Sequence, residues 1–504
     1  MRLTRDSRVA VMGAGAMGRG IAAVAAAAGH QVYLYDQDAA AAAAAPDAIA
    51  ADWAGLVRAG KWTPERLDAA RRRLRPVAQL SELADAALAI EAIVERLDAK
   101  QELLRRLEEV LPAETVLASN TSSLSITALA AGLRHPQRML GLHFFNPATR
   151  MKLVEVVSGL STAPLLADSL CALMRDWGKT PVATASTPGF IVNRVARPFY
   201  AEALRLLQER ACAPATLDAL LREAGGFALG PLELMDLIGH DVNFAVTQSV
   251  YQAMQQDSRF RPSPLQQELL AAGRLGRKSG HGFYDYSQAK PTPEAAPPQE
   301  PPAAVRVRGG LGVAEPLLAR LQAGGVRVER DPGPAQGWLE WESLRLALSD
   351  GRSATRRAAD SGHAGWAVFD LALDYASVRR LALAVADQAA PEVAARAEGV
   401  LQAAGLLASR MDDAAGMAVL RTVAMLANEA ADAVGQGVAT ADSVDLAMRL
   451  GTAYPCGPLA WADRLGNDFV AQTLDALCAH YGDERYRVSP LLRRLALSGG
   501  CFHD

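Results

Sequence analysis

"RVAVMGAGAMGRGIAAVAAAAGHQVYLYD", residues 8–36, is the stretch that decides the fold of the N-terminal part. It begins as a short apolar run, passes through closely spaced glycines into a segment typical of a helix, and ends in a second apolar run. This order is that of a βαβ unit with parallel strands. Further strand-like runs at 87–95, 115–121 and 138–144 are spaced for crossover helices. The sequence therefore predicts a mostly parallel α/β sheet of the Rossmann type.

The glycines of this stretch follow the pattern G-x-G-x-x-G directly after the first strand. Such a turn lets a pyrophosphate approach the backbone, and the helix N-terminus supplies amide donors and partial positive charge. Asp36 stands at the end of the next strand, where a carboxylate accepts hydrogen bonds from ribose hydroxyls. The two following residues are not arginines, so NAD is favoured over NADP. The alternative is a tight turn without a ligand. The expected cofactor-binding residues are Gly13, Ala14, Gly15, Ala16, Met17, Gly18 and Asp36.

Length and composition limit the classes of protein. A chain of 504 residues is expected to form two to four domains. Its net charge is −3 and its basic residues are scattered, which predicts no nucleic-acid partner. The sequence contains no apolar stretch long enough to span a bilayer and no signal-peptide pattern, so we expect a cytosolic location and no membrane partner. Its five cysteines lack metal-ligand spacing, and neither a metal site nor a disulfide framework is expected.

The pattern changes to long helices from residue 187, and residues 288–304 are rich in proline, as in an extended linker. The segment from Gly189 aligns without gaps on the segment from Gly416, and we call the separation of these two glycines the repeat offset. The match extends over nearly fifty residues, which is a signal of internal duplication. The expected domains are 1–186 (NAD-binding), 187–287 (helical, first copy), 288–304 (linker), 305–408 (degenerate α/β segment) and 409–504 (helical, second copy).

A second stretch, "GLHFFNPATRMKLVEVV" at 141–157, places His143 and Glu155 within apolar runs, where each needs a partner. A carboxylate that holds one imidazole nitrogen lets the other nitrogen take a proton and then stabilises the imidazolium. We expect the two side chains to meet at the carboxyl edge of the sheet, where open α/β folds bind ligands. The alternative is a satisfied core histidine and an unrelated surface glutamate.

Four motifs carry a resemblance to a known family. "SNTSSLSIT" from Ser119, the stretch 141–157, "TPGFIVNR" from Thr187 and "GRKSGHGFYDY" from Gly276 resemble, in order and spacing, the L-3-hydroxyacyl-CoA dehydrogenase family over residues 7–286. The form with two helical copies resembles the 3-hydroxyacyl-CoA dehydrogenases of bacterial phenylacetate degradation. The resemblance implies NAD-dependent oxidation of an L-3-hydroxyacyl-CoA, with 3-hydroxyadipyl-CoA and 3-hydroxybutyryl-CoA as competing substrates.

The resemblance also implies residue roles. His143 is the general base, Glu155 is its partner, and Ser122 and Asn193 hydrogen-bond the reacting oxygen of the substrate. From the residues alone, an N-cap role is favoured for Ser122. Asn193 is a polar residue within a helical pattern and needs a partner there. Lys61 is a candidate contact of coenzyme A, although its local sequence departs from the family. The positions near the cofactor are Glu95, Lys100, Ser122, Asn146 and Lys278.

The second helical copy departs from the first at the expected site. Leu420 stands where the first copy has Asn193, and an apolar side chain gives no hydrogen bond to a substrate. We therefore expect one active site per chain and an intrachain pseudo-dimer of helical domains, with a homodimer left open. Two rival interpretations are a non-catalytic NAD-binding protein and a hydratase–dehydrogenase. The first is disfavoured because His143 and Asn193 are both present, and the second because residues 305–408 lack the length of a hydratase domain.

Overall fold

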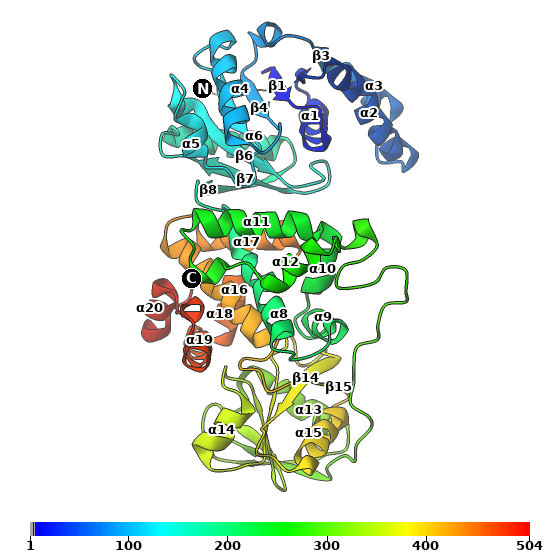
Figure 1. Cartoon of the computed structure of the whole chain (residues 1–504), viewed down its shortest axis with the longest axis vertical. Helices are drawn as coiled ribbons and strands as arrows, with labels where there is room; N and C mark the ends of the chain where they lie inside the picture. Colours follow the sequence, from blue (N-terminus) through cyan, green and yellow to red (C-terminus); the bar gives the residue numbers. More distant parts are fainter. Residues whose placement is uncertain (1–3, 5, 504) are drawn as a thin grey trace. The chain divides into compact units, whose positions relative to one another are not determined.

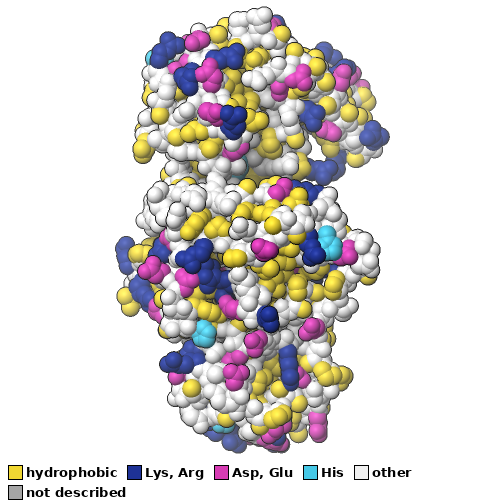
Figure 2. Space-filling view, in the orientation of Figure 1, with side chains coloured by type: hydrophobic (Ala, Val, Ile, Leu, Met, Phe, Trp, Pro, Cys, Tyr) yellow, Lys and Arg dark blue, Asp and Glu magenta, His cyan; other side chains and the backbone are white. Residues whose placement is uncertain are grey.

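The computed structural model describes residue 4 and residues 6–503, and it divides into two compact units. The first unit contains residues 1–194 and 437–452, and the second contains residues 195–436 and 453–504. On the face drawn in Figure 2, basic and acidic side chains are interspersed among apolar ones. The unit boundaries cross the domain limits expected from the sequence, since residues 187–194 and 437–452 lie with the N-terminal sheet.

The first unit is built on an eight-stranded sheet in the order β3-β2-β1-β4-β5-β6-β7-β8. All neighbouring strands are parallel except the antiparallel pair β6 and β7. Alternate strand residues pack into two hydrophobic clusters, one with α1 and α6 and the other with α4 and α5. The Rossmann-type sheet expected from the sequence is thereby confirmed. The strands are β1 (Val9–Met12), β2 (Val32–Tyr35), β3 (Leu74–Val77), β4 (Leu88–Glu91), β5 (Val116–Ser119), β6 (Met139–Phe144), β7 (Leu153–Ser158) and β8 (Thr180–Ala185).

The helices of this unit connect the strands (Figure 1). Helix α1 has no side-chain cap at its N-terminus, which follows the glycine turn. Helix α17 comes from the far end of the chain and contacts β7 and β8. The helices are α1 (Ala16–Ala28), α2 (Ala39–Arg58), α3 (Pro64–Arg71), α4 (Leu97–Val110), α5 (Ile126–Ala130), α6 (Pro164–Asp176), α7 (Val192–Val195, whose last residue belongs to the second unit) and α17 (Ala441–Thr452).

The second unit contains the remaining helices and a second sheet. Its seven-stranded mixed sheet has the order β10-β9-β11-β12-β13-β14-β15, and Figure 1 shows α14 on one side and α13 and α15 on the other. The strands are β9 (Ala304–Arg308), β10 (Arg327–Asp331), β11 (Trp338–Trp341), β12 (Leu344–Leu348), β13 (Trp366–Phe369), β14 (Arg380–Val385) and β15 (Leu407–Arg410). The helices around it are α13 (Pro316–Ala323), α14 (Ala354–Ser361) and α15 (Pro391–Ala403).

The two helical copies have corresponding helices. Residues 289–302, which lie within the predicted linker, are irregular and extended, and Ala296 donates its amide to Ala408 O at 2.7 Å. The first copy contains α8 (Arg197–Gln208), α9 (Pro214–Glu223), α10 (Pro231–Ile238), α11 (His240–Ala253) and α12 (Pro264–Ala271). The second contains α16 (Val419–Gly435), α18 (Pro458–Leu465), α19 (Asn467–Tyr481) and α20 (Pro490–Ser498), in addition to α17.

The structural repeat extends beyond the helical copies into the sheets. The first residues of β7 and β14, of α6 and α15, and of β8 and β15 are all separated by the repeat offset. Both pairs β6–β7 and β13–β14 are antiparallel, and both following pairs are parallel. The segment expected to be a degenerate α/β region therefore repeats the second half of the N-terminal sheet.

Buried ion pairs join the two helical copies within the second unit. Arg421 of α16 lies 2.6 Å from Glu202 of α8, and Arg259 of the first copy lies 2.9 Å from Glu429 of the second. Glu202 and Glu429 are themselves separated by the repeat offset. Burial raises the pKa of Glu202, but the charges of Arg421 and Arg485 outweigh it and hold the pKa below its ordinary value. Each of these two matching glutamates is therefore held by an arginine of the other copy.

Candidate active site

The proposed general base and its carboxylate partner lie on neighbouring antiparallel strands of the first unit. His143 of β6 is directly opposite Glu155 of β7 in the register, and His143 Nδ1 lies 2.6 Å from Glu155 Oε2. His143 is 6% exposed and Glu155 is 0% exposed. The contact expected from the sequence is therefore present, and it leaves Nε2 as the imidazole nitrogen that is not engaged by Glu155.

The buried carboxylate of Glu155 is stabilised from its other side by backbone. Its Oε1 accepts hydrogen bonds from the amides of Ile191 at 3.0 Å and Val192 at 2.9 Å. These amides belong to the turn that leads into α7, where Phe190 has a φ of +48°. Two amides and an imidazole thus satisfy the oxygens of this buried carboxylate. Sequence reasoning missed these donors because backbone amides leave no mark on residue type.

Asn193 and Ser122 also lie close together in the first unit. Asn193 Nδ2 donates to the backbone oxygen of Ser122 at 3.2 Å. Asn193 follows directly after Val192, so the turn that anchors Glu155 also positions this amide. The structure thus brings together Ser122 with Asn193 and His143 with Glu155.

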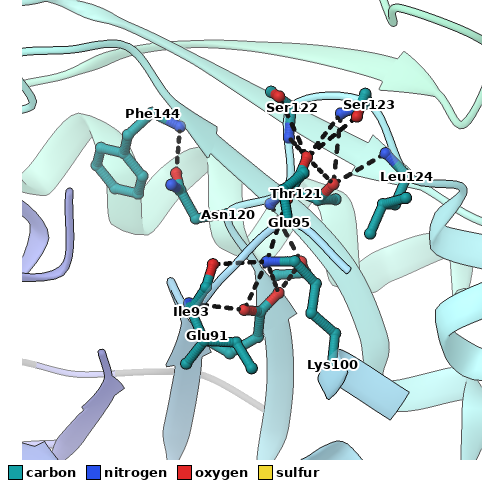
Figure 3. Close-up of polar contacts among 11 residues, drawn as sticks. Glu91, Ile93, Glu95, Lys100, Asn120, Thr121, Ser122, Ser123, Leu124 and Phe144 are labelled. Carbon is teal, nitrogen blue, oxygen red and sulfur yellow. Dashed lines mark hydrogen bonds and ion pairs between the residues drawn. The ribbon is translucent and has the colours of Figure 1, made fainter. Parts of the chain in front are cut away.

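Glu95 organises the loop that carries Ser122 (Figure 3). Its Oε1 accepts hydrogen bonds from Thr121 Oγ1 at 2.7 Å and from the Ser122 amide at 2.8 Å. The Ser122 hydroxyl lies 3.2 Å from the same oxygen. Burial opposes the charge of Glu95, but the charge of Lys100 and the hydrogen bonds from Thr121 and Ser122 hold its pKa below the ordinary value.

Lys100 is fully buried between two carboxylates. Its Nζ lies 2.8 Å from Glu91 Oε2 and 3.3 Å from Glu95 Oε2. Glu91, at the end of β4, also accepts a hydrogen bond from Ser119. The sequence placed Glu95 and Lys100 near the cofactor, and Figure 3 shows them supporting the Ser122 loop. Glu91 was not predicted, because a glutamate at a strand end gives no sequence signal for its buried partner.

The glycine turn has the geometry that a dinucleotide requires. Gly13 has a φ of +105°, and a Cβ on Gly18 would overlap Gly13 O, whereas the Cβ position of Gly15 is open. Asp36 Oδ2 accepts the Ala14 amide at 2.6 Å. A cavity of about 510 Å³ adjoins the turn. The uncapped helix α1, the open space at Gly15 and the acidic residue fit the pyrophosphate and ribose of NAD. The cavity is lined by Gly13, Gly15, Tyr35, Asp36, Gln37, Ala92, Ile93, Val94, Ala99, Glu102, Leu103 and Arg106.

The second sheet retains a glycine turn after β9, but the chain itself covers it. A Cβ on Gly309 would overlap Pro334 O, the Gly310 amide donates to Pro334 O at 3.1 Å, and the Gly337 amide donates to Gly310 O at 2.6 Å. Asp331, at the end of β10, forms an ion pair with Arg308 at 2.6 Å. In the first sheet, the glycine turn and the acidic residue fit a dinucleotide. In the second sheet, the corresponding turn and Asp331 bind other groups of the protein instead.

Three other predicted residues lie outside these contacts. Asn146 is exposed in the turn after β6 and precedes a cis proline. Lys61 is exposed in the turn after α2. Lys278 lies in the second unit, where its Nζ is 2.6 Å from Asp241 Oδ2. Their contacts to cofactor or coenzyme A stay predictions. No helix among residue 4 and residues 6–503 has the length and apolarity to cross a membrane.

Comparisons with known proteins match most of the chain. The family model of the 3-hydroxyacyl-CoA dehydrogenase NAD binding domain matches residues 8–187, and that of its C-terminal domain matches residues 189–286 and 416–501. A model described as the 3-hydroxybutyryl-CoA dehydrogenase reduced Rossmann-fold domain matches residues 346–414. The last match falls within the second sheet and the helices around it.

Two similar proteins and one solved structure are informative. The 3-hydroxyadipyl-CoA dehydrogenase of Escherichia coli K12 is 46% identical over 494 residues, which cover 97% of each chain. A probable 3-hydroxybutyryl-CoA dehydrogenase of Bacillus subtilis is 40% identical over 56% of this chain and 98% of its own. A crystal structure of a 3-hydroxybutyryl-CoA dehydrogenase from Escherichia coli K12 has a TM-score of 0.90 and 44% identity, and covers 99% of this chain and 100% of its own.

Proposed function

The chain belongs to the 3-hydroxyacyl-CoA dehydrogenase family, an NAD-dependent group of oxidoreductases, and from this we propose that its substrate is L-3-hydroxyadipyl-CoA. The product is the corresponding 3-oxoacyl-CoA. Support for the acyl chain comes from the relative that shares both halves of the molecule and is named for 3-hydroxyadipyl-CoA. The observation that carries the reaction is the buried contact of 2.6 Å between His143 and Glu155.

His143 acts as the general base in this proposal. Its Nε2 takes the proton of the 3-hydroxyl group, and the Glu155 carboxylate stabilises the imidazolium that results. The two backbone amides on Glu155 keep the carboxylate in place, so the imidazole presents Nε2 rather than Nδ1 to the substrate. NAD, when bound, supplies the acceptor for the hydride that leaves C3.

Ser122 and Asn193 hold the substrate oxygen as it becomes a carbonyl. A hydroxyl and an amide are donors that stabilise charge on such an oxygen. The Ser122 hydroxyl carries one proton, which it donates to Glu95 Oε1 at 3.2 Å, so this hydroxyl turns from Glu95 to the substrate oxygen when the substrate binds. Glu95 fixes the backbone of Ser122, and the contact of 3.2 Å between Asn193 Nδ2 and Ser122 O fixes the two residues relative to one another. Lys61, Asn146 and Lys278 are proposed as further contacts of coenzyme A or the cofactor.

The test of the substrate compares two thioesters with the same purified protein. NADH formation from L-3-hydroxyadipyl-CoA is expected to show kcat/KM about tenfold or more above that from L-3-hydroxybutyryl-CoA. The second substrate is the alternative that the E. coli structure favours by its name. A reversed preference replaces the adipyl proposal by the butyryl one, and no NADH with either thioester overturns both.

A further inference from the structure

Helix α17 belongs to the second helical copy in sequence but to the first unit in space. It contacts β7, which carries Glu155, and β8. Just before it, Val438 O accepts the amide of Ala185 at 2.9 Å, which ties the segment to the end of β8. The sheet of the catalytic pair is therefore covered in part by a helix that begins only at Ala441, in the second half of the chain.

Helix α17 approaches the catalytic elements closely at Gly451. A Cβ built on Gly451 would lie 2.9 Å from Leu153 Cδ2 and 2.9 Å from Val192 Cγ2. Carbon atoms in favourable contact are about 3.5–4.0 Å apart, so a methyl group does not fit. Val192 is β-branched and lies in a helical turn, where its χ1 angle has one strongly preferred value. The side chain of Val192 therefore cannot rotate away without movement of its backbone.

The backbone of Val192 is part of the catalytic geometry. Its amide is 2.9 Å from Glu155 Oε1, and Glu155 Oε2 is 2.6 Å from His143 Nδ1. Asn193 is the next residue and donates to Ser122 O. A displacement of Val192 thus alters both the support of the base and the position of the amide that faces the substrate oxygen.

We infer that Gly451 is a positioning residue for the reaction: by its lack of a side chain it lets α17 set the position of the turn at 190–193. This inference rests on the proposed function. It gives the second half of the chain a part in catalysis that goes beyond a packing surface, because the helix that fixes the active turn is supplied by the second copy.

The duplicated architecture provides a matched control. Ala224, at the end of α9, precedes Gly451 by the repeat offset, and α9 contacts β14 of the second sheet. The amide of Asp412 donates to Ala211 O just as that of Ala185 donates to Val438 O. The same junction therefore occurs twice. In the second junction, Ala382 stands at the position of Glu155, and the pair of base and carboxylate is absent.

The experiment compares Gly451→Ala with Ala224→Val in the full-length protein. Gly451→Ala is expected to lower kcat by about tenfold or more, because small displacements of catalytic groups are costly. The Kd of NADH, measured by titration, should stay within about twofold, since the glycine turn at 13–18 is untouched. Alanine also favours helix more than glycine does, so α17 itself is not weakened. Ala224→Val should leave kcat unchanged.

A double variant distinguishes positioning from general damage. Val192→Ala removes the Val192 methyl groups that the new Cβ meets, and the remaining contact, Leu153 Cδ2, stands at the end of a side chain that can rotate. Gly451→Ala/Val192→Ala should therefore recover kcat to within about threefold of the unaltered protein. Unchanged kcat in Gly451→Ala, an equal loss in Ala224→Val, or a double variant as impaired as Gly451→Ala would each overturn the inference. If the unaltered protein oxidises neither thioester, the proposed function fails first and the inference falls with it.

Discussion

At the scale of single residues, the molecule solves the problem of a buried histidine and a buried glutamate by pairing them. His143 Nδ1 and Glu155 Oε2 are 2.6 Å apart, and two amides complete the carboxylate. His143→Gln keeps the size of the side chain but has no group that takes a proton. We expect kcat to fall by about 10²- to 10⁴-fold, with the Kd of NADH nearly unchanged. Near-normal turnover in steady-state assays would remove His143 from the mechanism.

We expect Asp36 to determine the choice of cofactor. Its carboxylate lies beside the glycine turn, where it would repel a 2′-phosphate, which NADP has and NAD lacks. Asp36→Ser removes the repulsion, and the preference for NAD over NADP, measured as the ratio of kcat/KM values, should narrow by about tenfold or more. Equal kcat/KM for the two cofactors in the unaltered protein would contradict this role.

The sequence pattern predicts these functional side chains, but it predicts the groups that support them less well. His143, Glu155 and Asp36 can be recognised in the sequence because each is a polar residue within or at the end of an apolar run. Such a residue is costly to bury unless it has a specific partner. The supports of the site are hidden from sequence for physical reasons. Glu91 accepts a hydrogen bond from Lys100, which lies on the next helix, and only this contact shows its role. The amides of residues 191 and 192 belong to backbone, and every residue except proline has one.

At the scale of elements, the two sheets differ at the antiparallel strand pair that holds His143 and Glu155 in the first half. Asp370, directly after β13, follows His143 by the repeat offset, and Ala382 stands at the position of Glu155. The Asp370 carboxylate accepts the amides of residues 418, 419 and 420 at the start of α16. The first two correspond to Ile191 and Val192, which bind Glu155 in the first half. The equivalent amides of the second half are thus bound by a carboxylate that follows the other strand of the pair, and no histidine takes part.

The burial of Asp370 has a consequence for the pH dependence of stability. Burial raises the pKa of Asp370 to about 6, although the amides of Val419 and Leu420 act to lower it. Between the ordinary pKa of an aspartate and pH 6, Asp370 is protonated in the folded state and has lost its proton in the unfolded state. The free energy of unfolding therefore loses a contribution of up to about 3 kcal/mol as pH rises through this window.

Asp370→Asn tests this contribution, because an asparagine side chain does not titrate and the free-energy cost of burying it does not change with pH. Relative to the variant, the unaltered protein should be more stable at pH 4.5 than at pH 7, as measured by urea unfolding of both proteins at the two pH values. A stability difference that is equal at both pH values would show that Asp370 does not titrate in this range.

The elements were predictable where a local pattern defines them. The glycine turn, its flanking strands and the repeat from Gly189 are such patterns. The covered glycine turn after β9 was not predictable, since the segment 333–337 folds onto it by tertiary contacts that have no periodic signature. The assignment of α17 to the first unit was hidden for the same reason: its sequence belongs to a helical copy and only packing places it on β7 and β8.

At the scale of the whole molecule, two halves exchange elements as two subunits would. Ion pairs join the helical copies, and α17 and α9 each contact the sheet of the other half. A chain truncated after Tyr286 loses α17 and leaves the buried Glu202 without Arg421, a change that strands a buried charge. Size-exclusion chromatography with light scattering should show aggregates or a new dimer, with kcat strongly reduced. A monomeric, fully active truncation would contradict this view of the two halves.

The two helical copies also differ at the site. Asn193→Leu should lower kcat severely, because the donor to the substrate oxygen is lost, by about 10²-fold or more. Leu420→Asn, its counterpart, should leave kcat unchanged at some cost in stability, since Leu420 is buried. Steady-state kinetics on both variants decides the point, and equal losses in the two would argue against a single catalytic copy.

Only the first half of the duplicated chain is expected to form a cofactor site. In the first sheet the glycine turn opens on a cavity of about 510 Å³. In the second, the residues around Pro334 bind the turn, and the cavity beside it is about 180 Å³. Calorimetric titration of the full-length protein with NADH distinguishes one cofactor site per chain from two. We expect one equivalent bound per chain, abolished when Gly15 is replaced by a bulky residue. Two equivalents per chain would contradict it.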